Sequence, residues 1–127
     1  GGGRWGEYVA VLDGFQMGGM GLRIGSDGGW QGTLGLVTEL LAESIESNSA
    51  PDAVYCCGPE PMMKAVQQLC AVRRVPCWLS LETPMACGFG LCFSCVTRVK
   101  LDESGDNWDY RRTCVEGPVF PAELLLL

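Results

Sequence analysis

Four of the eight cysteines have the residue type and the spacing of ligands for a metal centre. Cys87, Cys92 and Cys95 share one short segment, with four and then two residues between them, and Cys114 lies beyond a further eighteen residues. Three thiolates on one loop, closed by a fourth thiolate from a distant segment, form the donor set of a plant-type [2Fe–2S] cluster. The chain has no histidine, which excludes Rieske ligation. The spacing therefore predicts a cluster that carries single electrons.

Two glycines lie between the first two cysteines of this set, at Gly88 and Gly90. Glycine permits unusual backbone angles, so amide N–H groups can approach the sulfur atoms closely. Hydrogen bonds of that kind favour the more negative, reduced state of a cluster and help to set its potential. We therefore expect the glycines to shape the cluster loop.

Two other uses of the four cysteines remain open. A structural zinc site normally uses paired C-x2-C knuckles, and only Cys92 and Cys95 form such a knuckle. A disulfide framework suits a secreted chain. The first residues contain no apolar signal-peptide core, and no apolar run approaches the roughly 18–20 residues that span a bilayer. We therefore expect a cytoplasmic location, where thiols stay reduced.

The composition narrows the class of protein. The chain has 127 residues, of which 47% are hydrophobic and 19% are charged, so it can bury a core. Its formal net charge is −6, and the sequence contains no large cluster of lysine or arginine. Nucleic acid and anionic membranes repel such a surface, and neither is an expected partner.

The remaining cysteines favour a structural role. Cys56, Cys70 and Cys77 lie in segments predicted to be strands or a helix stripe, and we expect all three in the core. Cys57 ends a predicted strand directly before Gly58, at the edge of an open α/β sheet where ligands bind. Its spacing alone still favours a core position.

The elements that must position these residues alternate between strand and helix. The predicted helices cover residues 33–46 and a segment that opens at Glu60, and the predicted strands cover residues 22–24, 53–57 and 75–81. This order is typical of a parallel sheet with crossover helices, and it predicts an α/β fold with a partial Rossmann-like parallel sheet.

The character of the sequence changes after Glu82. A segment rich in glycine and cysteine is followed by a predicted strand at 97–101, an acidic turn at 102–106 and a return strand at 110–114. We therefore predict a boundary near Glu82, between the α/β part at residues 1–81 and a small cysteine-rich β iron–sulfur module at residues 82–127.

Several segments together resemble a known family. They are residues 57–62 (CGPEPM), 81–82 (LE), 85–96 (MACGFGLCFSCV) and 114–120 (CVEGPVF). These segments resemble the electron-transfer subunit of dihydroorotate dehydrogenase B, in the ferredoxin–NADP reductase superfamily. The resemblance implies that the sheet is the second half of a ferredoxin-reductase NAD-binding domain.

The resemblance also implies a pyridine-nucleotide site. In the family the C-G-P-x-P-M turn lies beside the nicotinamide, which here corresponds to Cys57, Gly58, Pro59 and Glu60. The turn that contains Asp27 and Gly28 is similar to a family turn near the nucleotide. A plain glycine-rich turn explains Asp27 and Gly28 nearly as well.

The activity that the resemblance implies belongs to pyrimidine biosynthesis. A partner, the FMN-containing catalytic subunit, would oxidise dihydroorotate, and electrons would pass through the [2Fe–2S] cluster to FAD and then to NAD. The flavin-binding motif of the family has no counterpart in this sequence. We therefore expect the chain to be a C-terminal part of such a subunit, inactive on its own.

Two alternatives to this function remain. The same redox module could serve a cytosolic hydrogenase or a sulfite reductase, whose flavin-reductase subunits share the C-x4-C-x2-C loop. The four cysteines could instead stabilise a zinc-binding module with no redox role. The apolar residues Phe89, Leu91 and Phe93 lie on the cluster loop. We expect each either to contact a partner or to pack under the loop, and the sequence supports both equally.

Overall fold

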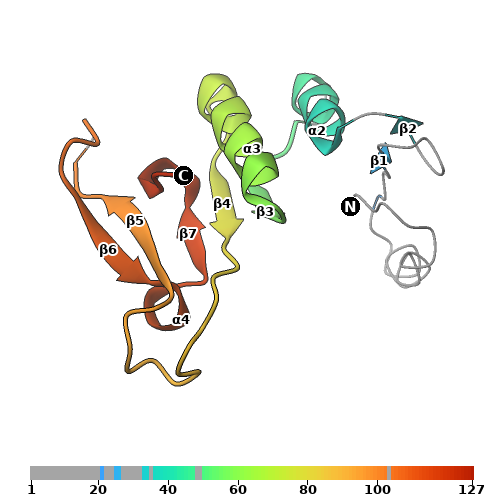
Figure 1. Cartoon of the computed structure of the whole chain (residues 1–127). Coiled ribbons are helices and arrows are strands. Elements are labelled where there is room, and N and C mark those ends of the chain that lie inside the picture. The colour runs from blue at the N-terminus through green and yellow to red at the C-terminus, as the bar shows by residue number, and fades with distance from the viewer. Residues whose placement is uncertain (1–20, 22–24, 27–32, 35, 48–49, 103) are drawn as a thin grey trace. The chain divides into compact units, whose positions relative to one another are not determined.

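The structure is a computed structural model of the 127-residue chain. It describes residues 21, 25–26, 33–34, 36–47, 50–102 and 104–127 (Figure 1). The chain divides into two compact units, residues 1–50 and residues 51–127. The strand predicted at residues 22–24 lies outside the described residues, as do Asp27 and Gly28.

The first unit contains two short strands and a helix. Strand β1 (Gly25–Ser26) pairs in parallel with β2 (Thr33–Leu34), and helix α2 (Val37–Glu46) follows. The backbone N–H of Leu36 donates to the Glu39 carboxylate over 3.2 Å, which satisfies one free amide at the start of the helix. The helix predicted at 33–46 therefore begins at Val37, because the two residues of β2 are extended and paired with β1.

The second unit is built on a three-stranded sheet in the order β3-β4-β7. Strands β3 (Val54–Cys57) and β4 (Cys77–Ser80) are parallel, and helix α3 (Glu60–Arg73) connects them (Figure 1). Strand β7 (Val119–Pro121) pairs antiparallel with β4. The α/β fold with parallel strands joined by a crossover helix is confirmed, and β7 is an addition that the sequence pattern did not predict.

Helix α3 carries the apolar stripe that its sequence predicts. Met63, Val66 and Cys70 are buried, at the spacing of one helical face. Arg74 caps the C-terminal end of the helix in the left-handed conformation. Its backbone N–H donates to the carbonyls of Ala71 and Cys70. In the described part of the chain no helix has both the length and the apolar character needed to cross a membrane.

A β-hairpin follows the cysteine loop. Strand β5 (Val96–Lys100) pairs antiparallel with β6 (Trp108–Arg112), and the short helix α4 (Thr113–Glu116) continues from β6. The Asp102 carboxylate accepts hydrogen bonds from the Ser104 hydroxyl and the Gly105 N–H in the predicted acidic turn, and the Ser104 contact lowers the pKa of Asp102. The predicted return strand ends at Arg112, because Thr113 already belongs to α4.

One core joins the sheet and the hairpin. Leu79, in the central strand, is fully buried and lies opposite Cys56 of β3 and Phe120 of β7. The core cluster also includes Met63, Leu81, Val99, Ala122 and Leu125. After β7, a 3-10 helix η2 (Ala122–Leu124) is connected to α3, because the Gln67 side-chain amide donates to the carbonyls of Ala122 and Leu125. The boundary between residues 81 and 82 stays a prediction.

Candidate functional site

The four candidate ligands come from a loop and a short helix that meet at the base of the hairpin. Cys87 and Cys92 lie on the loop between β4 and β5, Cys95 directly precedes β5, and Cys114 lies in α4. Cys95 is 1% exposed, and its Sγ lies 2.9 Å from the Sγ of Cys114. The buried Thr113 fixes this pair, since its N–H and its hydroxyl both donate to the Cys95 carbonyl, over 2.8 and 3.0 Å.

The first two cysteines form a second contact. Hydrogen bonds from the backbone N–H of Cys92, the backbone N–H of Phe89 and the Cys92 side chain lower the pKa of the Cys87 thiol to about 6. Gly88 and Gly90 have φ values of 73° and 83°, the left-handed region that favours glycine. The expectation that these glycines let amides reach a ligand sulfur agrees with this geometry.

The two side chains of the second cysteine pair shift each other's pKa in opposite directions. The side chain of Cys114 lowers the pKa of the Cys95 thiol, and the same contact raises the pKa of the Cys114 thiol. The contact therefore favours the thiolate at Cys95 over the thiolate at Cys114. A thiolate is the form that binds iron.

The four thiols fit a two-iron cluster in their donor chemistry. They form two close pairs, Cys87 with Cys92 and Cys95 with Cys114. A [2Fe–2S] cluster needs two thiolates on each iron, whereas a structural zinc needs all four around one ion. Two close thiol pairs provide the donors that two irons need.

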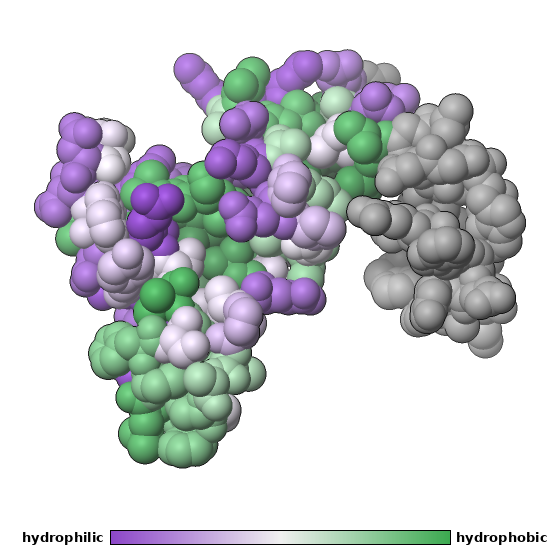
Figure 2. Space-filling model, in the orientation of Figure 1, coloured by the Kyte–Doolittle hydropathy of each residue, from purple (hydrophilic) through white to green (hydrophobic). Residues whose placement is uncertain are grey.

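The loop that carries the first three cysteines exposes large apolar side chains. Phe89, Leu91 and Phe93 are 73%, 76% and 71% exposed. Figure 2 shows apolar residues gathered at the lower end of the molecule, where this loop lies in Figure 1. Of the two expectations for these residues, packing beneath the loop is wrong. The loop presents an apolar surface beside the cysteines.

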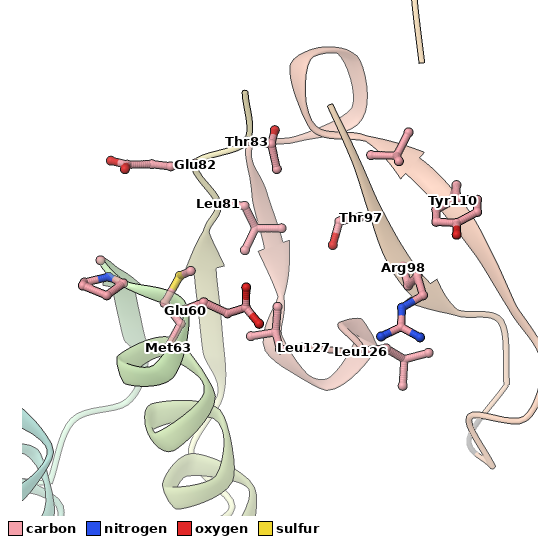
Figure 3. A pocket seen from close by; sticks show the side chains of 13 residues that line it. Glu60, Met63, Leu81, Glu82, Thr83, Thr97, Arg98, Tyr110, Leu126 and Leu127 are labelled. Atoms are coloured by element: carbon pink, nitrogen blue, oxygen red, sulfur yellow. The ribbon is translucent and has the colours of Figure 1, made fainter. Parts of the chain in front are cut away.

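A cavity of about 550 Å³ lies where strands β3 and β4 end. Gly58, Pro59 and Glu60 form one wall, directly after β3, at the carboxyl edge where open α/β sheets bind ligands. The hairpin supplies the opposite wall, and Figure 3 shows Thr97 and Arg98 directed into the space together with Glu60. The remaining lining residues are Met63, Leu81, Glu82, Thr83, Val96, Tyr110, Leu126 and Leu127.

Both parts of the chain are similar in sequence to domains of known proteins. Residues 82–126 match the iron–sulfur cluster binding domain of dihydroorotate dehydrogenase B, and residues 22–68 match the oxidoreductase NAD-binding domain. The electron transfer subunit of dihydroorotate dehydrogenase B (NAD(+)) from Caldanaerobacter subterraneus subsp. tengcongensis is 44% identical over 98 residues, which are 77% of this chain and 37% of that protein. The subunit of the same name from Geobacillus sp. strain WCH70 is 42% identical over 99 residues, 78% of this chain and 35% of that protein.

Both parts of the chain are therefore similar to the dihydroorotate dehydrogenase B electron-transfer subunits. The chain spans little more than a third of the length of these relatives. A solved structure of an NADH-dependent reduced ferredoxin–NADP oxidoreductase, reported for flavin-based electron bifurcation, is 30% identical with a TM-score of 0.77. The match covers 98% of this chain and 42% of that one, and it confirms the ferredoxin-reductase type of fold.

The nucleotide residues expected from the family resemblance are only partly brought together. Gly58, Pro59 and Glu60 line the cavity, whereas Cys57 does not and is exposed. The core position that spacing alone favoured for Cys57 is therefore wrong. Its place at the carboxyl end of β3 explains the exposure, because the chain turns away from the sheet at Gly58.

The other three cysteines, Cys56, Cys70 and Cys77, take structural positions. Cys70 is 1% exposed, as predicted, while Cys56 and Cys77 are half-buried and pack against the core. Burial raises the pKa of all three thiols, that of Cys77 to about 12. Thiols of that kind are poor ligands and poor nucleophiles at neutral pH.

Sequence reasoning missed the hairpin wall of the cavity. Thr97, Arg98 and Tyr110 belong to the predicted cluster module, and no local pattern connects them to the turn at Gly58. The hairpin comes to face the turn at Gly58 only because β7 and the hairpin fold back toward β4, and these segments are far apart in the sequence. The only sequence signal was the alternation of residues 97–101, which predicts a strand and no ligand.

The loop glycines of this cluster domain offer a paired test. A side chain at Gly90 would be strained at φ 83° and its Cβ would lie 3.0 Å from the Val115 side chain, whereas a side chain at Gly88, at φ 73°, would meet nothing within 4 Å. Both substitutions incur the strain of a left-handed backbone, but only Gly90→Ala adds the contact with Val115, so we expect it to shorten the lifetime of the bound cluster more than Gly88→Ala does. Loss of visible absorbance under a chelator measures the lifetime, and equal rates for the two variants would contradict the account.

Proposed function

We propose that this chain is the nucleotide-binding and cluster-binding part of the electron-transfer subunit of an NAD-linked dihydroorotate dehydrogenase, in pyrimidine biosynthesis. The observation that carries the proposal is that four thiols form two close pairs, Cys87 with Cys92 and Cys95 with Cys114. All four lie within the residues that match a cluster-binding domain. A bound [2Fe–2S] cluster supplies single-electron transfer between the FMN of a catalytic subunit and the FAD of the complete subunit.

The chain's own residues would hold the cluster in two halves. Cys87 and Cys92 would ligate one iron, and Cys95 and Cys114 the other. The backbone N–H groups of Cys92 and Phe89, which donate to the Cys87 sulfur, would stabilise negative charge there.

The cavity would take part of the pyridine nucleotide. Gly58, Pro59 and Glu60 form its entrance at the carboxyl ends of parallel strands, and the exposed Cys57 borders the same turn. The wall opposite comes from the hairpin of the cluster domain. We assign Asp27 and Gly28 to the same nucleotide on the family resemblance alone.

The partner would be the FMN-containing catalytic subunit in a hetero-oligomer. The apolar surface of Phe89, Leu91 and Phe93 lies beside the cysteines, and a partner that covers it would bring its flavin close to the cluster. We retain the division into a nucleotide-binding part at 1–81 and a cluster module at 82–127. We also propose a cytoplasmic location, where the four thiols stay available for iron.

The names of the relatives favour this function over the two alternatives. A hydrogenase or sulfite reductase subunit would use the same cluster loop with another partner, and a zinc module would need the four thiols around one ion. The pairing of the thiols and the match over residues 82–126 both support a cluster. The identity of the partner is the point that an experiment must decide.

The test of this function uses the complete subunit together with an FMN-containing dihydroorotate dehydrogenase catalytic subunit. Anaerobic dihydroorotate is expected to reduce the cluster, seen as the appearance of its EPR signal, and NAD is expected to reoxidise it. The 127-residue chain alone, loaded with its cluster, is expected to oxidise NADH no faster than background, because it contains no recognisable flavin site. Reduction by hydrogenase or sulfite reductase partners, without reduction by dihydroorotate, would overturn the proposal.

A further inference from the structure

Arg112 connects the two segments that carry the cysteines. It is the last residue of β6, two positions before Cys114, and its Nη1 donates to the carbonyl of Gly90 over 2.9 Å. Its guanidinium carbon lies 4.8 Å from the ring centroid of Phe93. Gly90 and Phe93 both belong to the loop that carries Cys87, Cys92 and Cys95. The side chain therefore reaches from the Cys114 segment to the loop of the other three ligands.

The backbone of Arg112 is itself well fixed. Its N–H donates to the Glu116 carboxylate over 2.8 Å, and it lies opposite Val96 in the hairpin register. Val96 directly follows Cys95. The pairing of β5 with β6 therefore fixes the backbone of Arg112 next to that of Cys95. The loop that it contacts is otherwise strongly exposed, as the side chains of Phe89 and Leu91 show.

We propose that Arg112 is a positioning residue for the cluster: it holds the loop at Gly90 and Phe93 against the Cys114 segment, and places a permanent positive charge against the loop that carries three of the four cysteines. The proposal rests on the proposed function, because it presupposes that these cysteines bind a cluster. Two effects follow. The contacts keep the Cys87–Cys92 half in place, and the charge favours the reduced cluster, which is one unit more negative.

The neighbouring arginine provides a matched control. Arg111 carries the same charge one residue earlier, and its guanidinium pairs with Asp109 over 3.1 Å and with Glu116 over 3.4 Å. These partners belong to β6 and α4, and neither lies on the cysteine loop. Removing Arg111 changes the net charge by the same amount as removing Arg112, without taking the contacts to Gly90 and Phe93.

The experiment compares Arg112→Gln, Arg112→Lys and Arg111→Gln in the complete, cluster-loaded protein. Arg112→Gln is expected to shift the midpoint potential to a more negative value and to speed cluster loss to a chelator by about tenfold, since a charged hydrogen bond and a cation–π contact are both lost. Arg112→Lys is expected to restore the potential, because it keeps the charge, and to restore the lifetime only in part. Arg111→Gln is expected to leave both close to those of the unmodified protein.

Amide hydrogen exchange over residues 88–93 in the metal-free protein tests the contacts without any cluster. Exchange is expected to be faster in Arg112→Gln and unchanged in Arg111→Gln. If Arg112→Gln takes up no cluster while Arg111→Gln does, that result also supports the positioning role, and the exchange rates of the two metal-free variants then provide the comparison. Equal potentials, lifetimes and exchange rates in the two glutamine variants would overturn it. Failure of the unmodified protein to take up iron and sulfide would instead defeat the proposed function.

Discussion

Replacing Cys95 with serine is expected to abolish cluster binding. Cys95 is 1% exposed, its Sγ lies 2.9 Å from that of Cys114, and its carbonyl accepts two hydrogen bonds from Thr113. A serine hydroxyl does not ionise near neutral pH and is a harder donor than a thiolate, so one iron would lose a strong ligand. We expect iron and sulfide contents close to zero, measured on protein reconstituted anaerobically.

The control for this prediction is the same chemical change at Cys57. Cys57 is exposed at the end of β3 and belongs to neither thiol pair, so Cys57→Ser should keep a full cluster. Circular dichroism should show that both variants fold, since the serine at position 95 still accepts the Thr113 bonds through its backbone carbonyl. A Cys95→Ser protein with two irons and two sulfides per chain would contradict the assignment of the ligands.

Filling the cavity with an indole is expected to weaken nucleotide binding. Thr97 lies in β5, half-buried, and its side chain points into the space opposite Glu60 (Figure 3). Tryptophan is well tolerated in strands, so Thr97→Trp should keep the hairpin while it occupies part of the 550 Å³. We expect the Kd for NADH of the complete subunit to rise at least about tenfold, which is about 1.4 kcal/mol.

Two matched variants separate this effect from disturbance of the strand. Thr97→Val keeps the size of the side chain and should bind NADH as the unmodified protein does. Lys100→Trp adds the same indole to the same strand outside the lining of the cavity, and it should also leave binding unchanged. Unchanged affinity in Thr97→Trp would show that the nucleotide binds elsewhere, while the iron content of each variant reports that the cluster domain is intact.

Local patterns in the sequence were enough to predict the cluster loop and most of the elements around it. Cys87, Cys92 and Cys95 lie within nine residues, and the geometry of such a loop depends on near neighbours and on glycines such as Gly90. The stripe of α3 follows in the same way from helical period. Short-range physics determines both features.

Features that depend on distant segments could not be predicted. Strand β7 has only three residues and no periodicity, and it exists because the chain returns to pair with β4. The same return closes the cavity between Gly58 and Thr97. Cys57 was expected to be buried because it ends an apolar run, yet the turn at Gly58 leaves it exposed. For β7 and the cavity the deciding contact is formed between residues far apart in the chain, whereas the exposure of Cys57 is decided by the turn at the next residue.

The central claim, that four thiols hold a [2Fe–2S] cluster, is tested most directly by one measurement. Anaerobically purified protein is analysed for iron and sulfide, and its EPR spectrum is recorded before and after dithionite. The account predicts two irons and two sulfides per chain and a rhombic signal that appears only on reduction. A colourless protein that carries one zinc and no sulfide would contradict it.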